Sequence, residues 1–218
     1  MKVLKWDCDL RKLSSIGALL LLGSLLSAPA LAHHPLGGKL PGNFFEGIMS
    51  GFGHPILGLD HLAFVVAIGL IGFTMTKGFI VPIAFVLMTA VGAGIHLAAI
   101  DLPIPELVIA TSVLLSGGFL IFQGRTQGTN HTALASVLVG LAGLFHGFAY
   151  GEGIFGAEPT PLVAYLIGFT CIQLVISLVA SGIASRLSRV ISVRQLTHFA
   201  GGAIAVIGLS FLSSAVMG

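Results

Sequence analysis

The stretch FIVPIAFVLMTAVGAGIHLAAI, residues 79–100, decides the fold class of this chain. It contains no Asp, Glu, Lys or Arg, and its single ionisable side chain is His96. A helix of about 20 apolar residues spans the hydrocarbon core of a bilayer. A helix also satisfies its own backbone polar groups, which lipid cannot do. The stretch therefore predicts a transmembrane helix with His96 near one end.

The composition of the whole chain agrees with this interpretation. Of its 218 residues, 56% are hydrophobic and only 8% are charged, whereas a soluble domain carries about 25% charged residues to wet its surface. The net charge of +2 provides no phosphate-binding surface. A soluble enzyme, a disordered chain and a nucleic-acid-binding protein are therefore excluded as classes.

The apolar residues divide the chain into six segments of spanning length. These predicted spans are residues 55–75, 79–100, 103–122, 132–150, 161–184 and 195–217. A shorter apolar stretch, NFFEGIMSGFG at 43–53, precedes them and suits an interfacial helix or a re-entrant piece. Most of the 30 glycines lie inside apolar runs, which is typical of closely packed membrane helices. We predict an all-α membrane protein with a six-transmembrane-helix bundle.

The first 32 residues have the pattern of a signal peptide. A basic start is followed by the short apolar run IGALLLLGSLL at 16–26 and by an Ala-Leu-Ala end at 30–32. This order is typical of secretory signal peptides, and the apolar run is too short to span comfortably. We expect cleavage after Ala32, which leaves the six-span domain at 33–218 with its N-terminus outside; the alternative is an uncleaved anchor.

The charges in the loops predict the same orientation. With the N-terminus outside, the inner connections carry Lys77, Arg125, Arg186, Arg189 and Arg194. The outer segments carry one basic residue, Lys39, and they hold or border Glu46, Asp60, Asp101, Glu106, Glu152 and Glu158. Basic residues accumulate on the cytoplasmic side of membrane proteins. The mature N-terminus is therefore expected on the periplasmic or extracellular side.

The first cluster of polar residues is HPILGLDH, residues 54–61. Pro55 suits the first turn of a helix, so we expect His54 at the mouth of the first span. His61 follows close to two turns later, which places both imidazoles on roughly one face, with Asp60 beside His61. Imidazole and carboxylate ligands suit Ni, Co and Zn. The pattern predicts a metal site in which Asp60 is a ligand or orients a histidine; the alternative is a helix cap with interhelical hydrogen bonds.

The second cluster is FHGFAYGE, residues 145–152, at the outer end of the fourth span. Gly147 and Gly151 allow either close approach of a neighbouring helix or local unwinding. Unwinding could bring His146 and Glu152 toward one ion. The alternative is a glycine-rich helix end with a solvated glutamate.

Three further candidates have weaker patterns. Glu106 lies in PIPELVIA, residues 103–110, where a helix N-terminus by itself favours an acidic residue. His96 could bind metal or hydrogen-bond to a neighbouring helix. The pair His33-His34 could capture metal at the mature N-terminus, or it merely follows the cleavage site.

These candidates share one side of the predicted bundle. Ionisable residues inside membrane spans are costly and usually functional. Four separate spans contribute to the outer half: His54, Asp60, His61, His96, Glu106, His146 and Glu152. His131 and His198 map to the inner side without an acidic neighbour, so we interpret them as structural or as weak exit-path candidates.

The motifs resemble those of the HupE/UreJ family of bacterial membrane proteins, which are nickel or cobalt permeases. HPILGLDH matches the family pattern HPxxGxDH, FHGFAYGE matches its second motif, and PIPELVIA resembles the stretch around its acidic residue in the third span. The resemblance covers the signal peptide and all six spans. It implies transport-critical roles for His54, Asp60, His61, Glu106, His146 and Glu152.

The resemblance implies uptake of nickel, or of cobalt, across the bacterial inner membrane for maturation of hydrogenase or urease. The ion is then the substrate, and no permanently bound cofactor is expected. The chain contains no G-x-x-x-x-G-K-[ST] loop, so it is not expected to hydrolyse ATP. The expected partners are the divalent ion and the lipid bilayer, and no nucleic acid is expected. The chain could also form a homo-oligomer.

Two rival functions remain at this point. An intramembrane metal-dependent hydrolase would use His and Asp ligands with a glutamate base, but the sequence contains neither HExxH nor G-x-S-x-G. We therefore expect a protein that is not an enzyme. A metal sensor or assembly protein that does not transport is the other alternative.

Overall fold

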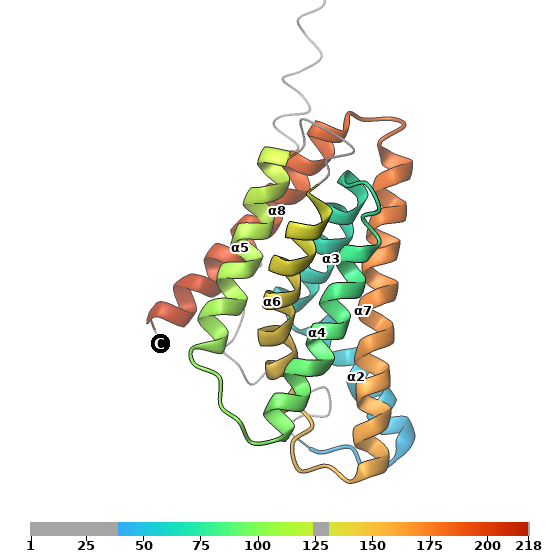
Figure 1. Ribbon diagram of the computed structural model, residues 1–218, viewed down its shortest axis with the longest axis vertical. Coiled ribbons are helices and arrows are strands. Elements are labelled where there is room, and N and C mark those ends of the chain that lie inside the picture. Colours follow the sequence, from blue (N-terminus) through green and yellow to red (C-terminus); the bar gives the residue numbers. More distant parts are fainter. Residues whose placement is uncertain (1–38, 124–130, 218) are drawn as a thin grey trace, which may run out of the picture.

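The computed structural model describes residues 39–123 and 131–217 (Figure 1). The predicted signal peptide, His33, His34 and Arg125 lie outside these residues. The described part is an all-helical bundle, as predicted. Its helices in chain order are α2 (Phe44–Leu57), α3 (Leu59–Thr74), α4 (Ile80–Leu97), α5 (Pro105–Gln123), α6 (Thr132–Glu152), α7 (Pro159–Leu187) and α8 (Val193–Met217).

Helices α4 to α8 are each long and apolar enough to cross a membrane. Their bounds lie within a few residues of the last five predicted spans. At about 1.5 Å per residue, the 18-residue α4 is about 27 Å long and the 29-residue α7 is about 43 Å long. The hydrocarbon core is about 30 Å thick, so α7 is long enough to extend beyond it.

The first predicted span, at 55–75, was wrong in its start. The helix axis bends by 81° between α2 and α3, and the break falls at Gly58, whose backbone is extended. Pro55 consequently lies near the end of α2, not in the first turn of a span. The apolar stretch at 43–53 forms most of this separate helix. The described residues therefore contain five single-helix candidate spans, or six if the bent pair counts as one.

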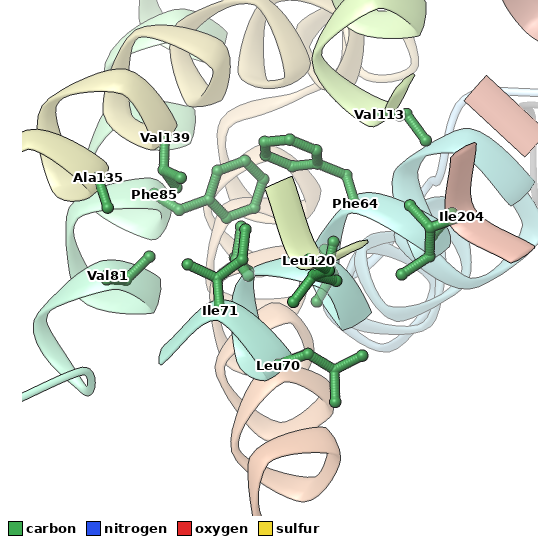
Figure 2. Packing of buried hydrophobic residues seen from close by; sticks show 14 of the residues in the cluster. Phe64, Leu70, Ile71, Val81, Phe85, Val113, Leu120, Ala135, Val139 and Ile204 are labelled. Atoms are coloured by element: carbon green, nitrogen blue, oxygen red, sulfur yellow. The ribbon is translucent and has the colours of Figure 1, made fainter. Parts of the chain in front are cut away.

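Helix α3 lies at the centre of the bundle. It contacts each of the other described helices, and a helix that is apolar on all sides is expected in such a position. Figure 2 shows Phe64 and Ile71 of α3 in one buried cluster with side chains from other helices: Phe85 of α4, Leu120 of α5, Val139 of α6 and Ile204 of α8. The residues that begin α3 are thereby held at a defined depth in the bundle.

Glycines let three pairs of helices approach closely. Gly147 of α6 lies against the backbone of Thr89 in α4, Gly51 of α2 against the backbone of α7, and Gly117 of α5 against the backbone of α8. A Cβ atom at any of these positions would collide with the facing helix. Small residues allow this kind of backbone approach in membrane bundles. The interpretation of the glycines as packing residues is confirmed.

The two ends of the described bundle carry opposite charges. The α3–α4 turn with Lys77 and the α7–α8 connection with Arg189 lie at the upper end in Figure 1, and Arg186 and Arg194 lie in the helix ends that flank this connection. The lower end holds Lys39 together with Glu46, Asp101, Glu106, Glu152 and Glu158. Between the ends, the exposed side chains include many large apolar ones, such as Leu87, Leu115, Phe122, Leu141 and Leu209. An apolar surface of this extent is the surface of a protein embedded in lipid.

Candidate functional site

Three histidines meet inside the bundle near its acidic end. His54 lies in the last turn of α2, His61 in the first turn of α3, and His146 in α6. All three are buried, with at most 2% of the side chain exposed. The ring centroids of His54 and His61 are 5.7 Å apart, and those of His61 and His146 are 5.1 Å apart. The bend at Gly58 therefore brings His54 and His61 together, and the prediction that they share one helix face was wrong.

His61 and His146 form one side of this cluster. Their Nδ1 atoms are 3.0 Å apart. The Nε2 atom of His146 lies 3.0 Å from the Oγ of Ser112, and Ser112 donates to the carbonyl of Ile109 at 2.7 Å. Phe64 stacks on the ring of His146, with centroids 4.4 Å apart. Both ring nitrogens of His146 thus have partners within the protein.

His54 forms the other side with two tyrosines. Its Nδ1 lies 2.7 Å from the hydroxyl of Tyr165, which donates to the carbonyl of Tyr150 at 2.8 Å. The ring of Tyr150 packs edge-on against His54 and His61, with centroid distances of 5.0 and 4.7 Å. Among the described residues, the fully buried Tyr150 hydroxyl has no hydrogen-bond partner. A buried polar group without a partner is rare, and a water molecule or an ion beside it is one explanation.

Asp60 places a carboxylate next to the cluster. Its side chain is only 7% exposed, and Oδ1 accepts from the backbone N–H of His61 at 2.8 Å. This position in the first turn of α3 suits a negative charge because the helix N-terminus is positive. Asp60 therefore accepts from the backbone of His61, and its carboxylate lies next to His61 at the start of α3.

Glu106 and Glu152 do not belong to the buried histidine cluster. Both are exposed at the acidic end of the bundle. Helix α6 remains helical through Glu152, and Gly147 and Gly151 pack against α4. Of the two alternatives for these glycines, close helix approach is confirmed and local unwinding is not observed.

The remaining histidines are also separate from the cluster. His96 lies in the last turn of α4, where its ring contacts Phe148 and Phe155, and its buried Nδ1 has no hydrogen-bond partner among the described residues. His131 precedes α6 and His198 approaches the carbonyl of Arg194, both at the basic end.

The histidine cluster is compact, but its ligand atoms are not gathered around one point. Within residues 39–123 and 131–217, no three His, Cys, Asp or Glu side chains are placed to hold one metal ion together. Any ion at this site would meet fewer protein ligands at a time, or the side chains would have to move. Such an arrangement differs from the closed four-ligand geometry of structural zinc sites.

The sequence patterns did not single out Tyr165 and Ser112. A signal existed for Tyr165, because the chain contains only two tyrosines and a buried tyrosine hydroxyl needs a hydrogen-bond partner. Ser112 offered no comparable signal, because serines that bond to their own helix are common in membrane spans. Both residues lie outside the three motifs. Tyr165 touches His54 because α7 packs against α2, and Ser112 touches His146 because α5 packs against α6.

The fold and the site together define a multi-pass helical membrane protein with a buried histidine cluster near one end of its bundle. The model of the family described as HupE / UreJ protein matches residues 19–211. The chain is also 32% identical over 190 residues to Protein HupE of Rhizobium leguminosarum bv. viciae, which covers 86% of this chain and 93% of that protein. The chain belongs to the HupE/UreJ family. No solved structure matches it.

Membership of this family has a general functional meaning. HupE/UreJ proteins are transport proteins and not enzymes, and membership supports a general role in nickel or cobalt transport. The long apolar helices also support a location in the membrane, with several spans.

Proposed function

We propose that this protein carries nickel, or cobalt, into the cytoplasm across the bacterial inner membrane, and that the buried histidine cluster is the part of the path that selects the ion. The observation that carries the proposal is the meeting of His54, His61 and His146 from three different helices. Polar groups that can ionise are rare inside membrane bundles and mark ion paths. The family relationship supports the same substrate class.

Each predicted residue has a distinct place in the proposed path. His54 and His61 bind the ion through imidazole nitrogens, and Asp60 offsets its charge where an unpaired charge would be costly. His146 holds His61 in place and joins the ligands when side chains move. Glu106 and Glu152 attract the ion at the acidic end, and His96, His33 and His34 are weaker contacts of the same kind.

Binding by few ligands at a time suits transport. Conduction requires binding that is strong enough to admit the ion and weak enough to release it. The spacing of the cluster, in which no three of the described ligand side chains converge, favours brief binding with some water retained on the ion.

The distribution of charge supports the direction of transport. Basic residues gather at one end of the described bundle, and this end is expected in the cytoplasm. The histidine cluster would then lie near the outer face, with the N-terminus of the mature chain outside after cleavage at Ala32. The membrane potential favours inward movement of a cation. The imported metal would supply the maturation of hydrogenase or urease.

Uptake into proteoliposomes tests the proposal. The purified full-length protein is reconstituted, nickel is added outside, and a metal-sensitive dye inside reports accumulation. We expect rapid uptake by the wild type, loss of uptake in His61→Ala, and wild-type uptake in the control Cys171→Ala, which changes an exposed side chain on α7. Absence of uptake by the wild type would refute transport, and equal uptake by His61→Ala would refute the site.

Metal preference is tested by competition in the same assay. Histidine and carboxylate ligands suit several divalent metals, so nickel uptake is measured with equal Co, Zn or Cu outside. We expect cobalt to compete most strongly. Stronger competition by zinc or copper would contradict nickel and cobalt as the preferred ions.

A further inference from the structure

We propose that Tyr165 and Ser112 are positioning residues that set the tautomers of His54 and His61, so that both rings carry their lone pair on Nε2 for the metal ion. The inference rests on the proposed function, because it concerns the same cation path. Its evidence is different, however, since it follows from two chains of hydrogen bonds that each end on a backbone carbonyl.

The first chain begins at His54. The Tyr165 hydroxyl lies 2.7 Å from Nδ1 of His54 and 2.8 Å from the carbonyl oxygen of Tyr150. A carbonyl oxygen only accepts, and a hydroxyl has one proton. The Tyr165 proton therefore goes to the carbonyl, and the hydroxyl oxygen accepts a proton from Nδ1 of His54. Neutral His54 with a proton on Nδ1 has its lone pair on Nε2.

The second chain begins at His61 and passes through His146. Ser112 donates its proton to the carbonyl of Ile109 at 2.7 Å, so its oxygen accepts from Nε2 of His146 at 3.0 Å. Neutral His146 then has its lone pair on Nδ1. The contact of 3.0 Å between the Nδ1 atoms of His146 and His61 consequently requires a proton on Nδ1 of His61. His61, like His54, has its lone pair on Nε2.

The two chains give the cluster a defined chemistry. A metal ion binds the nitrogen that lacks a proton, and the tautomer of a ligating histidine is set by the hydrogen bond of its other nitrogen. An isolated neutral imidazole can adopt either tautomer, so part of its population would offer no lone pair on Nε2. Here, Tyr165 on α7 and Ser112 on α5 remove that alternative for both rings. His146 transmits the effect of Ser112 to His61.

Nitrogen-15 NMR of the histidine rings tests the assignment directly. The full-length protein is labelled at histidine, reconstituted in lipid nanodiscs and kept free of metal. We expect protonated Nδ1 and unprotonated Nε2 for His54 and His61, and the reverse for His146. Protonated Nε2 in His54 or His61 of the wild type would overturn the proposal without any variant being needed.

Variants separate the two chains. Tyr165→Phe is expected to create a mixture of tautomers at His54 and to leave His61 unchanged, whereas Ser112→Ala should affect His146 and His61 but not His54. Two matched controls lose a hydroxyl that bonds only within its own helix in the described structure: Thr170→Val on α7 and Ser116→Ala on α5. The proposal is refuted if these controls shift the ring nitrogens as much as Tyr165→Phe and Ser112→Ala do.

Nickel uptake then connects the tautomers to transport. Loss of a hydrogen-bond partner behind a metal ligand typically reduces metal affinity or activity by about 10- to 100-fold, so Tyr165→Phe and Ser112→Ala should raise the apparent KM for nickel by at least about 10-fold. Ser112→Thr retains the hydroxyl and should restore most of the affinity. If the wild type transports nickel and both variants keep its KM, the inference about the tautomers is overturned but the proposed function stands. If the ring spectra are as expected but the wild type takes up no nickel, the proposed function is refuted but the tautomer assignment stands.

Discussion

The Nδ1 atoms of His61 and His146 lie 3.0 Å apart, although 85 positions separate the two residues in the chain. Two features of the local structure lie beside this contact. The break at Gly58 places His61 at the start of α3, and the glycines of α6 let that helix approach α4 closely. The contact therefore depends on how the helices pack. Changes at Gly58 or at the glycines of α6 should alter nickel uptake.

Gly147→Ala should destabilise the bundle. Its added Cβ would collide with the backbone of Thr89 in α4, and backbone cannot move aside as a flexible side chain can. Overpacking of this kind costs about 1–3 kcal/mol. We expect a lower Tm in detergent and reduced nickel uptake, because His146 is the adjacent residue.

Gly94→Ala is the matched control for this change. Gly94 lies in α4, and no atom within 4 Å would meet its added Cβ. Alanine favours a helix by about 1 kcal/mol over glycine, so Tm should stay the same or rise. A fall in Tm equal to that of Gly147→Ala would show that the glycines contribute through something other than close approach.

Gly58→Ala should impair transport with little effect on stability. The backbone of Gly58 has φ of −73°, which alanine adopts without strain. Its Cβ would lie 2.8 Å from Cδ2 of His61, so the imidazole must shift. We expect slower nickel uptake with a Tm near that of the wild type. Gly42→Ala is the control, because its Cβ would make only an ordinary contact, and its nickel uptake should be normal. Equal losses of uptake in Gly58→Ala and Gly42→Ala would contradict a steric effect on His61.

Asp60→Asn should separate the charge of Asp60 from its hydrogen bond. The amide oxygen of asparagine can still accept from the backbone N–H of His61, so only the interaction of the charge with the helix N-terminus, about 0.3–1 kcal/mol, is lost. Tm should therefore change little. Nickel uptake should fall by about 10-fold or more, as for other partners of metal ligands. Wild-type uptake by Asp60→Asn would mean that the carboxylate serves only the helix start, and Asp60→Ala should then lower Tm.

Glu106→Gln and Glu152→Gln should act mainly on capture of the ion. Both carboxylates are exposed at the acidic end, where negative charge raises the local concentration of cations. We expect a higher apparent KM for nickel, an unchanged maximal rate, and a smaller difference from the wild type at high salt, because salt screens exposed charges. A lower maximal rate with unchanged KM would instead place these residues among the ligands in the path.

Much of the fold was predictable because membrane spans depend on local properties of the chain. A run of apolar residues such as 79–100 forms a helix wherever it packs, since lipid leaves its backbone no other partners. The bounds of α4 to α8 and the opposite charges of the two ends followed from the same local reasoning. Gly58 was harder to interpret, because glycine in a membrane helix commonly serves close helix packing.

The sequence by itself determined the class of protein, the helical spans and the small set of ionisable residues from which a site could be built. Charge is so scarce in this chain that His54, Asp60, His61 and His146 stand out without a structure. Only the tertiary structure decided which of them meet and which side chains hold them. Those contacts depend on which faces of α2, α3, α5, α6 and α7 pack together. The packing is set jointly by glycines and large side chains from distant segments. The contacts of Tyr165 and Ser112 with the histidines therefore became visible only when the helices were placed in space.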